Sequence, residues 1–218
     1  MTEFENGGPP ALEPGDHRRL ARVLLAAARE RRPVDPLSAG YPQLTVADAR
    51  RIRDSALADR LAEGERLAGA VASPGRAGEP RLAWLTKSMV LSDANVPLVD
   101  LIDPYVEPRL ALRLVRPLAS PIDSVSALVR ASRGLRLCLE VVDSRYAPGP
   151  TTTADEIADN CGTSKVFVAG DTAAPGVDVL ADGAIDALVM LAACVARRQG
   201  GLEPGTLLVA PLHGAAGR

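Results

Sequence analysis

The chain has 218 residues, of which 25 are basic and 27 acidic, for a formal net charge of −2. This length fits one large domain, or one domain with a helical appendage. The near balance of charge argues against a nucleic-acid binder that works through a general basic field. No apolar run approaches the roughly 20 residues that a membrane span needs. Because the first residues are polar and acidic, we also expect no signal peptide.

Cysteine and histidine usage limits the kinds of site that the chain can build. Cys138, Cys161 and Cys194 stand alone, without Cys-x-x-Cys spacing. They fit reduced, mostly buried thiols, so we expect a cytoplasmic protein. His17 and His213 have no metal-ligating residue three or four positions further on. A zinc site is therefore not expected.

The N-terminal part predicts a helical pair. Residues 1–15 are rich in glycine and proline, and we expect a disordered lead there. Apolar spacing predicts a helix over 17–32 with Asp16 as its N-cap. A second helix is predicted over 45–64, with Asp48 in the acid position of a capping box. Its charged residues are expected to form a solvated face: Arg50, Arg51, Arg53, Asp54, Asp59 and Arg60.

Beyond this pair the pattern changes to short apolar runs that are typical of strands. The predicted strands lie in 66–71, 82–85, 89–91, 96–102, 110–115, 135–145, 165–169 and 205–210. Further helices are predicted to begin at Ser120-Pro121-Ile122-Asp123, where Gly134 ends the helix, and to cover 153–158 and 183–198. The chain is thus predicted to be α+β, with a helical segment over 16–64, a β-rich core over 65–212 and a tail over 213–218.

The stretch 135–145 holds the first candidate for a site. Its apolar residues alternate and then continue into a valine pair, but Glu140 interrupts them. A carboxylate there is costly to bury unless it is paired or holds a metal. Glu140 either lies on the solvated face of an edge strand or belongs to a site. Asp143 and Arg145 favour the site, because they add an acid and a cation where the strand ends.

The order of motifs resembles the 2-hydroxypenta-2,4-dienoate hydratase and 4-oxalocrotonate decarboxylase family, a branch of the fumarylacetoacetate hydrolase-like superfamily. The specific part of the resemblance is Leu139–Arg145, followed by Ile157–Asn160 and Phe167–Asp171. Upstream segments that also fit are Tyr41–Ala49, Gly64–Arg66, Trp84–Thr86 and Pro108–Leu110.

Membership in this family would imply a mixed barrel or roll core, an N-terminal helical pair and flanking helices. It would also imply a homo-oligomer, or a hetero-oligomer with a homologue, and a pocket for a small dienol or keto acid. In the working enzymes of the family, three carboxylates hold Mg²⁺ or Mn²⁺, and the metal grips the 2-keto acid.

The chain departs from the family where these metal ligands stand. The family pattern after Pro-Arg is Val-Glu-Ala-Glu, whereas this chain has Leu110-Ala111-Leu112-Arg113. Only Glu140 remains of the three carboxylates, and a hard divalent ion needs several oxygens. We therefore expect no metal and no other cofactor. If the strands pair as in the family, Arg113 lies beside Glu140 on the adjacent strand. The guanidinium then either replaces part of the metal's charge or neutralises Glu140 in a dead pocket.

Three functions remain open. The first is a metal-independent lyase, isomerase or cyclase that acts on a small, enolisable, unsaturated carbonyl compound in a bacterial biosynthetic pathway. The second is a non-catalytic hydratase-like partner or ligand-binding subunit, and the third is a genuine metal-dependent 2-keto-4-pentenoate hydratase or decarboxylase. The candidate catalytic residues are Glu140, Asp143, Arg113 and Arg145. The candidate substrate-binding residues are Lys87, Ser144, Asp159 and Thr163.

Overall fold

A computed structural model describes residues 11–74, 80–93, 95–96, 98–122, 124–169 and 182–212. The chain forms two compact units. The first contains Met1–Glu65, Val96–Tyr105 and Val142–Gly162, and the second contains Arg66–Asn95, Val106–Val141 and Thr163–Arg218. The first unit therefore adds two later segments to the predicted N-terminal helical segment. Several predictions lie outside the described residues, namely the lead over 1–10, Asp123, Gly170–Asp171 and the tail over 213–218 with His213.

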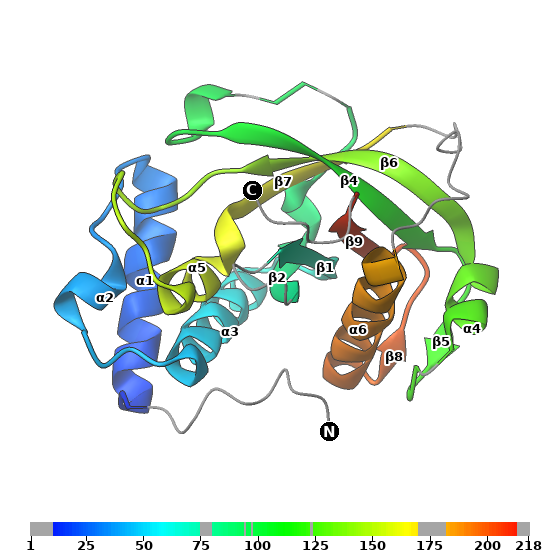
Figure 1. The fold of residues 1–218 in the computed structure, drawn as a ribbon, viewed down its shortest axis with the longest axis horizontal. Coiled ribbons are helices and arrows are strands. Elements are labelled where there is room, and N and C mark those ends of the chain that lie inside the picture. Colours follow the sequence, from blue (N-terminus) through cyan, green and yellow to red (C-terminus); the bar gives the residue numbers. More distant parts are fainter. Residues whose placement is uncertain are drawn as a thin grey trace. The chain divides into compact units, whose positions relative to one another are not determined.

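Helices dominate the first unit (Figure 1). They are α1 (Pro14–Glu30), α2 (Leu37–Gly40), α3 (Val46–Ala62) and α5 (Thr153–Ala158), with short 3₁₀ turns at Leu98–Asp100 and Asn160–Gly162. The α3 helix packs against both α1 and α5. Its face toward them is apolar because Ala49 and Ile52 recur at helical spacing and are fully buried. Tyr146 and Ile157 complete this core.

The capping box predicted for the second helix is confirmed. The Thr45 side chain accepts from the backbone N–H of Asp48, and the Asp48 carboxylate accepts from the backbone N–H of Thr45. The same carboxylate accepts the N–H groups of Ala11 and Leu12, each at 3.0 Å. Leu12 is buried, so residues 11–15 are not part of a disordered lead. Two smaller predictions for this helical pair are also wrong, because Glu13 is the N-cap of α1 and Arg53 is buried.

The second unit is built on a curled sheet of seven strands among the described residues (Figure 1). Across the sheet the order is β2 (Pro80–Thr86), β1 (Leu67–Pro74), β9 (Leu207–Pro211), β4 (Tyr105–Leu114), β6 (Ser132–Val142), β7 (Thr163–Val168) and β3 (Val90–Leu91). The β1 and β9 strands run parallel, and β4 runs antiparallel to β9. Gly69 makes the first pairing possible, since a Cβ there would lie 1.7 Å from the carbonyl oxygen of Leu207.

Two helices belong to the second unit, α4 (Val125–Arg130) and α6 (Asp182–Gln199), together with a small sheet of β5 (Leu118–Ala119) and β8 (Gly201–Leu202). The α6 helix packs against β1 and β9. A helix start at Ser120 is wrong, because α4 begins at Val125 and Ser124 is its N-cap. A strand over 96–102 is also wrong, since the chain forms a 3₁₀ turn there.

Within the described ranges, no helix combines the length and the apolar character that crossing a membrane requires.

Candidate active site

Glu140 lies on β6 and has no exposed surface. Both of its oxygens accept a hydrogen bond. Oε2 accepts from Nε of Arg109 at 2.7 Å, and Oε1 accepts from the hydroxyl of Thr163 at 2.7 Å. These partners lie on β4 and β7, the two strands that flank β6 in the sheet. The sheet order therefore brings three distant parts of the sequence to one carboxylate, and the alternative of a solvated Glu140 is excluded.

Arg109 connects Glu140 to a second carboxylate. Its Nη2 lies 2.5 Å from Oε2 of Glu107, two positions earlier on the same strand. The side chain of Arg109 is 6% exposed, whereas that of Glu107 is 38% exposed. One guanidinium thus bridges a fully buried carboxylate and a partly exposed one. We call Glu107, Arg109, Glu140 and Thr163 the Arg109 cluster. All four residues belong to the second unit.

The surroundings of Glu140 oppose its ionisation. Burial raises the pKa of Glu140, while the charge of Arg109 and the hydrogen bond from Thr163 act in the opposite direction. Burial also raises the pKa of the neighbouring thiol of Cys138 to about 12, and the charge of Glu140 contributes to that shift. The thiol therefore stays protonated and is not a nucleophile. A carboxyl group with a raised pKa is better matched to proton transfer near neutral pH than an exposed glutamate.

The predicted contact between Arg113 and Glu140 is wrong. Among the described residues Glu140 is bound by Arg109 and Thr163, and no contact joins it to Arg113. The pairing of β4 with β9 is regular from Arg109 to Arg113, so the side chains at 109, 111 and 113 share one face of the strand. Arg113 is on the expected face, but Arg109 is the residue whose guanidinium reaches the carboxylate.

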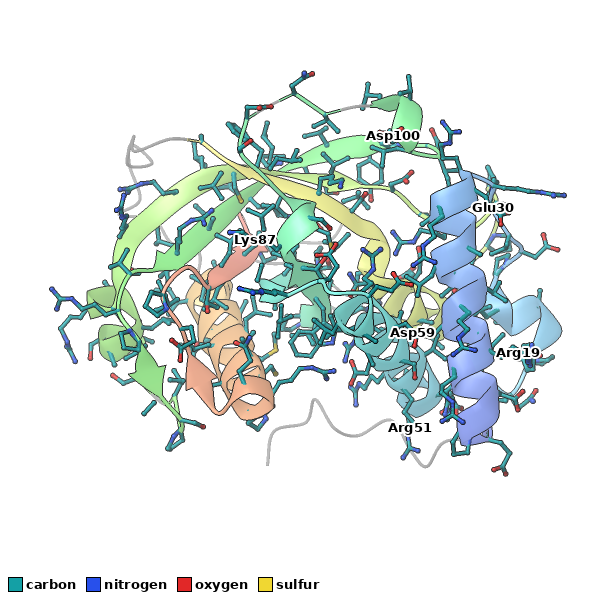
Figure 2. The ribbon with its side chains drawn as sticks, turned by 180° about the vertical axis from the view of Figure 1, so that it is seen from behind. Arg19, Glu30, Arg51, Asp59, Lys87 and Asp100 are labelled. Atoms are coloured by element: carbon teal, nitrogen blue, oxygen red, sulfur yellow. The ribbon has the colours of Figure 1, made fainter. Side chains whose placement is uncertain are left out.

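Lys87 lies at the start of a 3₁₀ turn, Lys87–Met89, where its side chain is exposed (Figure 2). Its backbone N–H donates to the carbonyl of Arg66 at 2.9 Å. No contact links Lys87 to the Arg109 cluster within the part of the chain that the structure describes. As a substrate-binding residue, Lys87 stays a prediction.

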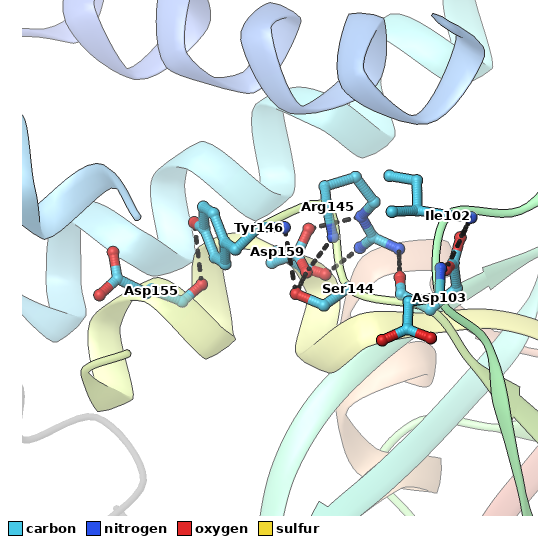
Figure 3. Close-up of polar contacts among 8 residues, drawn as sticks. Ile102, Asp103, Ser144, Arg145, Tyr146, Asp155 and Asp159 are labelled. Carbon is cyan, nitrogen blue, oxygen red and sulfur yellow. Dashed lines mark hydrogen bonds and ion pairs between the residues drawn. The ribbon is translucent and has the colours of Figure 1, made fainter. Parts of the chain in front are cut away.

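The other predicted site residues gather in the first unit, where α5 and the segment after β6 meet (Figure 3). Arg145 donates from Nε to Oδ1 of Asp159 at 2.5 Å and from Nη1 to the carbonyl oxygen of Asp143 at 2.8 Å. Its Nη2 donates to the carbonyl oxygen of Asp159. The hydroxyl of Ser144 donates to Oδ2 of Asp159 at 3.3 Å. The sequence prediction thus selected four residues that do lie together.

The polar groups of this second cluster are used to hold the fold. The Asp143 carboxylate accepts the backbone N–H groups of Ile102 and Asp103 at 2.9 to 3.2 Å, which fixes a segment 40 residues earlier in the chain. Asp159 is 3% exposed, and its burial raises its pKa while the charge of Arg145 lowers it. These contacts give Asp143, Arg145 and Asp159 a structural task. Their catalytic or substrate-binding roles stay predictions.

The donor set of the Arg109 cluster does not fit a divalent ion. Both oxygens of Glu140 are already engaged, and a guanidinium lies between the two carboxylates where a metal would need them to converge. Ala111 and Arg113 offer no oxygen ligand. The described residues contain no group of three histidine, cysteine, aspartate or glutamate side chains that could hold a metal ion. The side chains of the Arg109 cluster and of positions 111 and 113 therefore do not supply the free oxygen ligands that a divalent ion needs.

Comparison with solved structures identifies the class of fold. The chain superposes on 4-oxalocrotonate decarboxylase from Pseudomonas putida G7, in a complex with magnesium and adipate, with a TM-score of 0.77 at 20% identity. The superposition covers 93% of this chain and 89% of that one. The fold is therefore of the fumarylacetoacetate hydrolase-like type, as the sequence predicted.

Sequence comparison narrows this class to a family. The chain is 33% identical over 166 residues to 2-hydroxypent-2,4-dienoate hydratase from Pseudomonas putida, covering 71% of this chain and 73% of that protein. It therefore belongs to the 2-keto-4-pentenoate hydratase and 4-oxalocrotonate decarboxylase family. It is 32% identical over 160 residues to 2-hydroxyhexa-2,4-dienoate hydratase from Comamonas testosteroni, a match over 67% of this chain but only 60% of that relative's length. No family model matches the chain.

Proposed function

We propose that this protein is a proton-transfer enzyme of the lyase and isomerase type that acts on a small, enolisable, unsaturated 2-keto acid without a divalent ion. The observation that carries the proposal is the fully buried Glu140, held between a guanidinium and a hydroxyl. The relatives named hydratases of 2-keto-4-pentenoate and related dienoates support this class of substrate.

The proposed step is a tautomerisation in which atoms balance without a co-reactant. Glu140 takes a proton from C3 of the 2-keto acid, and the electron pair of that C–H bond forms the C2–C3 double bond. The carbonyl oxygen becomes an enolate, whose charge Arg109 stabilises. Return of the proton at C5 of a 4-unsaturated acid shifts the double bond, whereas return at C3 regenerates the starting material.

Three members of the cluster then have separate tasks. Arg109 supplies a fixed positive charge, because a guanidinium stays protonated at any pH of interest. Thr163 orients the Glu140 carboxylate through its hydrogen bond to Oε1. Burial raises the pKa of Glu140, which makes its carboxylate a stronger base than that of an exposed glutamate.

Deuterium exchange tests this proposal. Purified protein is mixed with 2-keto-4-pentenoate in D₂O, with a chelator present, and exchange at C3 is followed by NMR against the rate in buffer. We expect exchange that a chelator does not change and that Glu140→Gln abolishes. Glu203→Gln is the matched control, because Glu203 is exposed in the same unit. Exchange that needs added Mg²⁺ would refute the metal-independent function.

A non-catalytic function is the second candidate, and one observation favours it. Every charged group of the Arg109 cluster already has a partner inside the cluster, as expected of an ion pair that merely survives in a site without activity. In that case the protein would bind a ligand or associate with a homologue. Absence of C3 exchange above the buffer rate, in wild-type protein that is folded by its thermal melt, would favour this candidate.

A further inference from the structure

The two carboxylates of the Arg109 cluster are held very differently. Glu140 has no exposed surface and is fixed by a second hydrogen bond from Thr163. Glu107 is bound to Nη2 of Arg109, and its side chain is 38% exposed. Among the described residues, no other hydrogen bond or ion pair holds the Glu107 carboxylate. The guanidinium is thus covered by a removable anion on its outer side and by a permanent one on its inner side.

Only one of these anions can be exchanged at low cost. Removing Glu140 from Arg109 would leave a buried charge unpaired, which is strongly destabilising. Removing Glu107 costs much less, since solvent weakens an ion pair that has a partly exposed member. A dissolved anion that competes for the guanidinium therefore competes with Glu107.

We propose that Arg109 binds the carboxylate of the substrate and that Glu107 is a built-in counter-ion that this carboxylate displaces. The inference rests on the proposed function and names the residue that recognises the acid group of its substrate. The Nη2 position already carries a carboxylate oxygen in the free protein, so its geometry suits another carboxylate. The contact between Nε and Glu140 is kept, and the guanidinium therefore does not move when the ligand binds.

Arg113 makes the same face of β4 more attractive for an anion. It lies two positions beyond Ala111 and forms no ion pair with any of the described residues. The charge of Arg109 is shared with Glu140 and Glu107, so Arg113 supplies the guanidinium of this face that has no anionic partner among the described residues. A guanidinium of this kind raises the local concentration of small anions. It also favours a carboxylate over an uncharged analogue of the same shape.

Isothermal titration calorimetry with pyruvate and with the uncharged pyruvamide tests the subsite. Pyruvate serves because it carries the 2-keto acid group without the unsaturated chain. We expect Glu107→Gln to bind pyruvate about two- to fivefold more tightly than the wild type, because the competing anion is gone. The control Glu203→Gln also removes one negative charge from the second unit, and its affinity should equal that of the wild type. Pyruvamide should not bind any of these proteins.

Loss of the subsite needs a variant that still folds. Arg109→Met alone would strand Glu140, so the variant Arg109→Met/Glu140→Met removes the buried pair as a unit. It should lose pyruvate binding while keeping a cooperative thermal melt. Pyruvate binding that survives in this double variant, an unchanged affinity in Glu107→Gln, or equal binding of inorganic phosphate would overturn the assignment.

The subsite and the proposed reaction fail in distinguishable ways. If pyruvate binds as expected but 2-keto-4-pentenoate shows no C3 exchange, the carboxylate subsite stands and the proton-transfer function falls. If exchange occurs while Glu107→Gln leaves pyruvate affinity unchanged, the reaction stands and the counter-ion is misassigned.

Discussion

Replacing Arg109 by methionine should destabilise the protein by about 3 kcal/mol at pH 7. Methionine keeps most of the apolar stem of the side chain, so the substitution mainly removes the charge. Glu140 then loses its 2.7 Å contact with Nε and remains fully buried with the single hydrogen bond from Thr163. Removal of one partner of a buried ion pair typically costs about 3–5 kcal/mol.

Protonation of Glu140 sets an upper limit on this cost. The stranded carboxyl can become neutral, and the price of that change depends on how far the pH lies above its ordinary pKa of about 4.3. At about 1.4 kcal/mol per pH unit, neutralisation costs roughly 4 kcal/mol at pH 7 and about 1 kcal/mol at pH 5. The destabilisation should therefore be large at neutral pH and small in mild acid.

The direction in which stability changes with pH follows from the direction of the pKa shift of Glu140. Burial raises the pKa of Glu140 in the folded state, so the folded protein binds the proton more tightly than the unfolded chain. The stability associated with the protonated form is fully present below the unfolded pKa and is lost as the pH rises through the higher folded pKa. Without Arg109 the folded pKa rises further, and stability should fall over a wider range of pH.

Thermal melts at pH 5 and pH 7 measure this effect. For a chain of this length, about 3 kcal/mol corresponds to a fall in Tm of roughly 6–12 °C. Arg113→Met is the matched control, because Arg113 lies on the same strand face without an ion pair to any described residue, and its Tm should change by less than about 2 °C. The variant Arg109→Met/Glu140→Met should recover most of the loss. Equal melts for the two single arginine variants would refute the assignment of Arg109 as the partner of Glu140.

Two further substitutions test the clusters separately. Thr163→Val should cost about 1–3 kcal/mol, because one oxygen of the buried Glu140 loses its donor, while Thr163→Ser should retain most of the stability. In the first unit, Asp159→Asn should cost about 3 kcal/mol through loss of its buried pair with Arg145. Its control, Asp59→Asn, breaks only an ion pair whose members are both partly exposed and should cost less than about 0.5 kcal/mol. Denaturant unfolding monitored by circular dichroism measures all four.

Local sequence signals predicted the elements whose cause is local. The capping box at Thr45 and the helix Thr153–Ala158 were predicted because both depend on residues within one helical turn. The helix expected from Ser120 fails for a reason that spacing cannot reveal. Its Ser-Pro start fits a helix cap, but the helix begins after Ser124, whose side chain accepts from the backbone N–H of Ala127. The strand predicted from the apolar run 96–102 is wrong as well, and the large side chains of Leu98 and Val99 in that run are exposed.

The sequence predicts Glu140 as a site residue but does not predict its main partner. Glu140 stood out because a carboxylate inside an apolar run demands a partner, and the structure supplies two. The identity of the main partner depends on which residues of β4 and β6 meet, and such a register is not encoded in either strand alone. Arg109 was available as a signal, since it belongs to the Pro108–Leu110 motif and shares a strand face with Ala111. The resemblance to the family favours Arg113 instead, because Arg113 stands at the position of one of the family's metal ligands.

The partly exposed Glu107 bears on how strongly the guanidinium of Arg109 holds an added anion. A buried Arg109 paired only with Glu140 would be nearly neutral toward a ligand, because the two charges lie 2.7 Å apart between hydrogen-bonding atoms. A second carboxylate of moderate exposure keeps Arg109 satisfied in the free protein without competing strongly once an anion arrives. The affinity for an anion then depends on how much more strongly Arg109 binds the carboxylate of the ligand than it binds the carboxylate of Glu107. Substitutions at Glu107 should therefore tune affinity, whereas substitutions at Glu140 should change the fold's stability and the proton transfer.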